Sequence, residues 1–65
     1  MNELMIVLEG GSFFYFPTTY GSAQKAFNVF LNNLSTAGIN GDNIQYKHAI
    51  LRDKDYEDID RIDFK

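Results

Sequence analysis

The stretch that decides the fold is Leu4–Pro17, which reads LMIVLEGGSFFYFP. The apolar run 4–8 is too short for a helix and has β-branched residues at its centre, so it predicts a strand. A second strand is expected over Ser12–Phe16, because Pro17 cannot donate a hydrogen bond to a strand ladder. Gly10-Gly11, between the two runs, favours a two-residue hairpin turn.

This turn would decide which side chains share a face of the hairpin. A two-residue turn pairs Leu8 with Phe13, Val7 with Phe14, Ile6 with Tyr15 and Met5 with Phe16. One face then carries Leu4, Ile6, Leu8, Phe13 and Tyr15. The other face carries Met5, Val7, Phe14 and Phe16.

A helix is expected to cover one of these faces. The second face ends in the polar residues Glu9 and Ser12, so we assign it to the outside and the first face to the helix. An uncovered apolar patch on the order of a few hundred Å² usually marks an interaction surface. The residues predicted to form a partner or dimer interface are therefore Met5, Val7, Phe14 and Phe16.

The segment from Tyr20 to Ala37 changes to a helical period. Its apolar residues fall on one stripe when successive residues are placed about 100° apart, which predicts an amphipathic helix. Thr19 or Ser22 can cap the start of this helix. Gly38 is placed to adopt the left-handed conformation that commonly ends a helix.

The C-terminal half predicts further strands. Ile44–Leu51 reads as a third strand, with Ile44, Tyr46, His48 and Ile50 on one face. Asp60–Phe64 alternates apolar and charged residues and favours a short fourth strand. In the alternative, the tail folds back over the second hairpin face and leaves a self-contained monomer. The tail residues that would cover this face are Tyr56, Ile59, Ile62 and Phe64. The expected fold is a single α+β domain over residues 1–65, with the order ββαβ(β) and one helix on one face of a small, largely antiparallel sheet.

Composition disfavours several classes of function. The chain has 65 residues, no cysteine, six Lys and Arg, and nine Asp and Glu, which gives a net charge of −3. A chain of this size buries only about 60% of its unfolded surface, so association is an expected source of stability. The acidic balance disfavours nucleic-acid binding, which depends on phosphate contacts. The absence of cysteine excludes disulfides and all cysteine-based metal sites.

No catalytic, cofactor-binding or metal-binding residue is predicted. The acids that alternate from Asp53 resemble the start of a calcium loop, but Asp58 stands where the glycine is needed and Phe64 where the bidentate glutamate is needed. His48 is the only histidine, and no nucleophile stands in a recognisable setting, so an enzyme is not expected.

The function expected is that of a small non-enzymatic protein-interaction module. It would be an accessory or inhibitor-type protein of the cytoplasm, of a kind that phages encode, which binds a partner protein, itself as a homodimer, or both. The possible acidic contact surface for a basic partner is Asp53, Asp55, Glu57 and Asp58. The alternatives are a nucleic-acid-linked regulator, which would use the hairpin aromatics for stacking, and an acidic nucleic-acid mimic.

One family resemblance accompanies these alternatives. The segment Gly10–Pro17, followed by a helix that contains Ala23 and Ala26, resembles the opening hairpin and helix of HicB-type antitoxins. This resemblance implies a toxin-binding protein. It covers less than half of the chain, and the glycine-containing loop between hairpin and helix is missing from this sequence.

Overall fold

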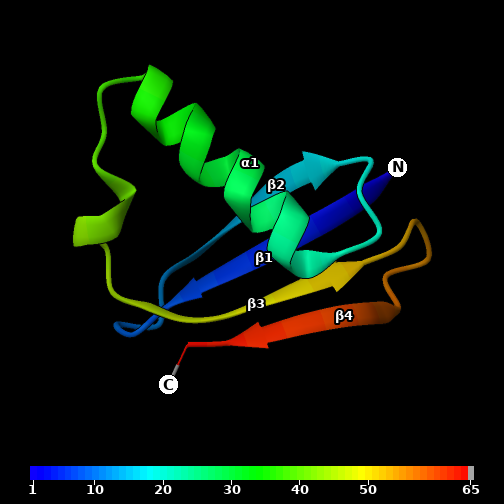
Figure 1. Ribbon diagram of the computed structural model, residues 1–65. Coiled ribbons are helices and arrows are strands. Elements are labelled where there is room, and N and C mark those ends of the chain that lie inside the picture. The colour runs from blue at the N-terminus through cyan, green and yellow to red at the C-terminus, as the bar shows by residue number, and fades with distance from the viewer. Residues whose placement is uncertain (65) are drawn as a thin grey trace.

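The computed structural model describes residues 1–64, which form a two-layer α+β fold in which a helix lies against one face of an antiparallel sheet (Figure 1). The elements are β1 (Asn2–Leu8), β2 (Phe13–Thr18), α1 (Ala23–Thr36), the short 3-10 helix η1 (Gly41–Asn43), β3 (Tyr46–Arg52) and β4 (Asp58–Asp63). The strand order in the sheet is β2-β1-β3-β4. The expected fold class is confirmed, including the fourth strand.

The hairpin turn is longer than the sequence predicts. The N–H of Leu8 donates to the carbonyl of Ser12 at 2.8 Å, and the N–H of Gly11 donates to the carbonyl of Leu8 at 3.0 Å. Glu9, Gly10 and Gly11 therefore form a three-residue loop, which ends with Gly11 in the left-handed region at φ 93°. A three-residue hairpin loop characteristically ends in such a residue. The predicted two-residue turn is wrong.

The extra loop residue shifts the strand pairing by one position. Ile6 lies opposite Phe14, and Met5 lies opposite Tyr15. Because successive side chains of a strand alternate between faces, this shift moves every side chain of β2 to the other face.

Phe14 and Phe16 consequently lie under the helix. Their ring centroids are 5.4 and 5.7 Å from the ring centroid of Phe30 in α1. Their predicted place on the uncovered face is wrong, because the three-residue loop exchanges them with Phe13 and Tyr15. The side chains of β1 lie as expected, with Leu4 and Ile6 buried under the helix.

The core lies between the sheet and one side of α1. Small side chains at two positions of the helix allow it to approach the central strands closely. The buried residues of this core are Leu4, Ile6, Ala23, Ala26, Phe27, Phe30, Ala49 and Leu51. Ser22 caps the helix by accepting from the N–H of Lys25, and Gly38 follows its end at φ 82°, so both sequence-predicted end signals are confirmed.

β3 contains an irregularity that changes one predicted face. Val7 lies opposite His48, whereas the next residue, Leu8, lies opposite Tyr46, so one residue of β3 is left over between these pairs. Such a bulge turns the preceding side chain to the other face. The ring of Tyr46 lies on the helix side, 4.9 Å from the ring of Phe27. The prediction that Tyr46 shares a face with His48 and Ile50 is therefore wrong.

The C-terminal segment extends the sheet. Ile62 lies opposite Ala49, and the N–H of Phe64 donates to the carbonyl of Lys47. The rings of Phe64 and Phe27 lie 4.8 Å apart on the helix side. The alternative in which the tail covers the second hairpin face is wrong, because β4 pairs beside β3, and Ile62 and Phe64 pack on the helix side of the sheet.

Candidate interaction surface

The face of the sheet opposite α1, which we call the outer face, is built from three cross-strand rows. Residues paired across antiparallel strands point to the same side of a sheet, so the pairing defines each row. The rows are Phe13–Val7–His48–Asp63, Tyr15–Met5–Ile50–Arg61 and Pro17–Glu3–Arg52–Asp58.

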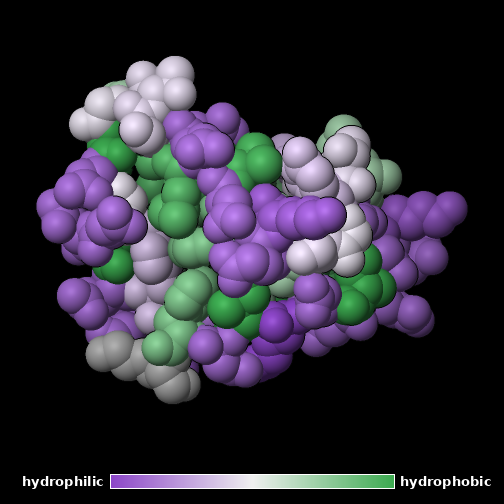
Figure 2. Space-filling model, viewed as in Figure 1, coloured by the Kyte–Doolittle hydropathy of each residue, from purple (hydrophilic) through white to green (hydrophobic). Residues whose placement is uncertain are grey.

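The first two rows place an apolar area on the adjacent strands β1 and β2. Phe13 is 55% exposed and Tyr15 49% exposed. Their rings meet edge to face with centroids 5.6 Å apart. Met5 and Val7 are half-buried beside them on β1, and Ile50, their neighbour on β3, is buried. Figure 2 shows the side of the molecule that carries α1, where hydrophobic and hydrophilic surface lie next to each other.

Arg52, in the third row, contacts both a carboxylate of its own row and the aromatic part of the apolar area. Its guanidinium lies 3.3 Å from a carboxylate oxygen of Glu3. The same group lies over two rings, 5.5 Å from the centroid of Tyr15 and 5.6 Å from that of Tyr56. Its Nε has no hydrogen-bond partner among residues 1–64. One carboxylate and two aromatic rings therefore hold this arginine, through an ion pair and cation–π contacts.

Arg61 and Asp63 form a second ion pair, on β4. The guanidinium of Arg61 contacts the carboxylate of Asp63 through Nη2 at 2.9 Å and through Nε at 3.0 Å. The hydrogen bond from Arg61 lowers the pKa of Asp63 from its ordinary value, and the nearby His48 contributes in the same direction. Each arginine of the outer face is thus paired with a carboxylate.

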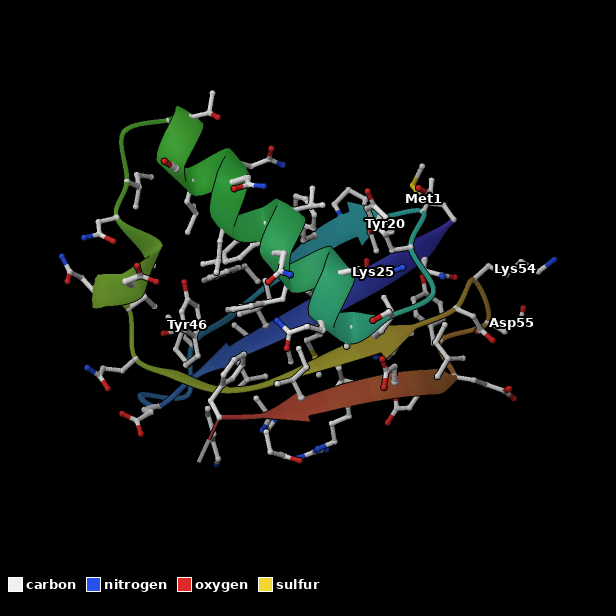
Figure 3. The ribbon with its side chains drawn as sticks, viewed as in Figure 1. Met1, Tyr20, Lys25, Tyr46, Lys54 and Asp55 are labelled. Carbon is white, nitrogen blue, oxygen red and sulfur yellow. The ribbon has the colours of Figure 1, made fainter. Side chains whose placement is uncertain are left out.

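The four acids predicted as a contact surface lie together at the turn between β3 and β4 and at the start of β4. One of them holds the turn together, because Oδ1 of Asp53 accepts from the N–H groups of Asp55 and Glu57 at 2.8 and 3.1 Å. The side chain of Asp55 extends away from the sheet, next to Lys54 (Figure 3). Asp55, Glu57 and Asp58 are exposed. Asp58 belongs to the row that contains Glu3 and Arg52, and Asp55 and Glu57 precede it in the turn.

The structure therefore brings together only half of the predicted interface. Met5 and Val7 lie on the outer face, whereas Phe14 and Phe16 do not. The aromatic residues that sequence reasoning missed are Phe13 and Tyr15. The signal that could have found them is the triplet Glu9-Gly10-Gly11, which also fits a three-residue loop with glycine at its left-handed position.

Other surface features offer little chemistry. A hollow of about 490 Å³ lies at the C-terminal end of α1, and Asp42 is the one ionisable residue among those that line it. Within residues 1–64, no group of three or more histidine, cysteine or acidic side chains could hold a metal ion. The helices in this part of the chain are too short or too polar to cross a membrane.

The comparisons with protein-family models, with curated proteins and with solved structures each found no match for this chain.

Proposed function

We propose that this protein is a small non-enzymatic interaction module that binds a partner protein through the outer face of its sheet. One observation carries the proposal: partly exposed apolar side chains of β1 and β2 lie together on the face opposite α1, with Phe13 and Tyr15 about half-exposed. Continuous exposed apolar patches of this kind characterise protein contact sites. Tyrosine and phenylalanine are also enriched in such contacts.

The charges around this area support a proposal about the chemistry of the partner. At the end of the sheet next to the β3–β4 turn, Asp55, Glu57 and Asp58 outnumber Lys54. A partner with an apolar centre and basic residues on one side of it matches this distribution. Opposite charges raise the rate of encounter, whereas apolar burial mainly slows dissociation.

Nucleic acid fits the same face less well. The rings of Phe13 and Tyr15 are suited to base stacking. However, Arg52 is paired with Glu3, and Arg61 is paired with Asp63. Phosphate binding needs basic groups that are available along the backbone of the ligand. The outer face therefore favours a protein surface over a single strand.

Binding kinetics with a partner purified from the native host test this proposal. Val7→Lys places a charge in the apolar area and should accelerate dissociation strongly. Asn28→Lys adds the same charge on the exposed side of α1 and should leave dissociation unchanged. A complex that forms equally well with Val7→Lys would contradict the proposal, as would a wild-type protein that binds single-stranded nucleic acid in place of protein.

The acidic turn is tested separately. The triple variant Asp55→Asn, Glu57→Gln and Asp58→Asn removes three charges and leaves Asp53, which organises the turn. Association with the partner should slow and lose most of its salt dependence, while dissociation changes little. If association keeps its wild-type rate and salt dependence, the partner does not recognise this turn.

A further inference from the structure

The two edges of the sheet are protected to different degrees. β4 forms one edge, and its sequence DIDRID carries four charged side chains. β2 forms the other edge, and its sequence FFYFPT carries none. Charged residues on an edge strand oppose pairing with another chain, whereas an uncharged apolar edge permits it. Within residues 1–64, no strand pairs with the far side of β2.

The backbone groups that β2 presents at this edge follow from its pairing with β1. The N–H of Leu8 donates to Ser12, which makes these two residues a hydrogen-bonded pair. In an antiparallel ladder, hydrogen-bonded and non-bonded pairs alternate. Phe13, Tyr15 and Pro17 therefore belong to non-bonded pairs, and their main-chain groups point away from β1. Proline has no N–H, so Phe13 and Tyr15 supply the open donors.

We propose that β2 pairs in antiparallel orientation with β2 of a second copy of this chain, about a two-fold axis that passes between the two copies of Phe14. In this register, Phe13 forms a hydrogen-bonded pair with Tyr15 of the second copy, and Tyr15 does so with Phe13 of the second copy. All four open N–H groups find a carbonyl acceptor. The resulting assembly is a continuous sheet of eight strands.

Pro17 disfavours the neighbouring register, which is centred on Tyr15. Centring the axis on Tyr15 would place Pro17 opposite Phe13 of the second copy, where the proline ring occupies the position of the missing amide hydrogen and crowds the opposing carbonyl. Centring it on Phe14 leaves Pro17 beyond the paired donors.

A second copy fits this edge for two further reasons. The two β2 strands meet without like charges, although the chain as a whole carries −3. The rings of Phe13 and Tyr15, which already contact each other in one copy, meet their counterparts across the new strand pair on the outer face. Both helices lie on the same side of the joined sheet, and the two outer faces become one surface. This assembly goes beyond the proposed partner binding, because it uses the edge of β2 and leaves Met5 and Val7 uncovered.

Sedimentation across micromolar to millimolar concentrations, combined with amide hydrogen exchange, tests the proposal. The wild type should shift with concentration from a 7.5 kDa species to one of twice that mass. The amide hydrogens of Phe13 and Tyr15 should become protected in parallel. Tyr15→Pro removes an open donor from each copy, and Tyr15→Ala removes the same ring but keeps the donor. Tyr15→Pro should weaken dimerisation about tenfold or more relative to Tyr15→Ala, while circular dichroism confirms that both variants are folded.

Other outcomes would overturn the proposal. The proposal is wrong if the wild type stays monomeric at all these concentrations. It is also wrong if the protein forms a dimer in which the amides of Phe13 and Tyr15 exchange as fast as in the monomer. Equal dimerisation of Tyr15→Pro and Tyr15→Ala would also exclude edge pairing. If Tyr15→Pro fails to fold, the exchange rates of the Phe13 and Tyr15 amides in the wild type decide whether the dimer forms through the edge of β2. Val7→Lys should lose partner binding but dimerise as the wild type does. A failure of the proposed partner binding can therefore be distinguished from a failure of the proposed dimer.

Discussion

The side chain of Asp60 in β4 accepts a hydrogen bond at 2.7 Å from the N–H of Ala23, the first residue of α1. The two residues are 37 positions apart in the sequence. α1, over residues 23–36, has no acidic side chain in its own first turn. The N-terminus of a helix carries a partial positive charge, and here the carboxylate that stabilises it comes from the last strand. This contact couples the C-terminal segment to the start of α1.

This contact predicts a pH-dependent stability. The hydrogen bonds from the N–H groups of Ala23 and Arg61 lower the pKa of Asp60 below its ordinary value. A carboxylate whose pKa is lower in the folded state contributes stability above the unfolded pKa, about 3.9, and loses that contribution as the pH falls through the folded pKa. The melting temperature of the wild type should therefore exceed that of Asp60→Asn at neutral pH.

The difference between these two proteins isolates the effect of Asp60. It should shrink as the pH is lowered below about 4. Asp63, whose pKa is also lowered, is present in both proteins, so its contribution cancels. A difference in melting temperature that is constant from neutral to acidic pH would show that the charge of Asp60 does not stabilise the helix.

The two glycines of the hairpin loop should respond differently to alanine. Gly11 has φ 93°, where a side chain is strained, whereas Gly10 has an ordinary φ, and neither has an atom within 4 Å of an added Cβ. Gly11→Ala should therefore cost about 1 kcal/mol in urea unfolding, and Gly10→Ala should be close to neutral. The reverse order would place the left-handed residue at Gly10, as in a different turn.

Aromatic substitutions test the assignment of faces. Phe30 is buried in the core, and Phe14 packs on it, so both substitutions to alanine should destabilise the fold, with Phe30→Ala costing about 3 to 5 kcal/mol. Phe13→Ala should cost less than Phe14→Ala, because Phe13 lies on the outer face. Chemical denaturation measures all three. If Phe13→Ala destabilises more than Phe14→Ala, the strand register is incorrect.

Gly41 lies close to side chains of α1 and β3, so a larger residue at this position would displace them. A Cβ at this position would lie 2.7 Å from Cδ2 of Leu31 and 3.2 Å from the hydroxyl of Tyr46. That hydroxyl also donates to the carbonyl of Gly41 at 2.9 Å. Gly41→Ala should therefore cost about 1 to 3 kcal/mol. Gly21→Ala is the matched control, since nothing lies within 4 Å of its added Cβ, and equal stability of the two variants would contradict this packing.

The elements could be predicted from the sequence because their signals are local. Alternation indicates β4, the helical stripe indicates α1, and Ser22 and Gly38 mark the ends of α1. The register of the hairpin could not be predicted in the same way. Gly10-Gly11 fits a two-residue loop and, with Glu9, a three-residue loop, and these differ by one position in the pairing.

The remaining features depend on contacts between distant parts of the chain. The bulge that turns Tyr46 toward the helix depends on how β3 fits beside β1, and nothing in the sequence near Tyr46 marks it. The hydrogen bond from Ala23 to Asp60 requires β4 to be placed at the edge of the sheet first. Met5 and Val7 could be assigned to the outer face from the alternation within β1 alone. The assignment of Phe13 and Tyr15 to this face depends on the length of the hairpin loop.

Site-specific photo-crosslinking in the native host tests the central claim most directly. A benzophenone side chain in place of Tyr15 reports on the outer face, and the same group in place of Asn28 reports on the exposed side of α1. We predict an adduct with a distinct protein at position 15 and no such adduct at position 28. Adducts with the same protein at both positions, at position 28 alone, or with copies of this chain alone would contradict the claim that the outer face binds a partner protein.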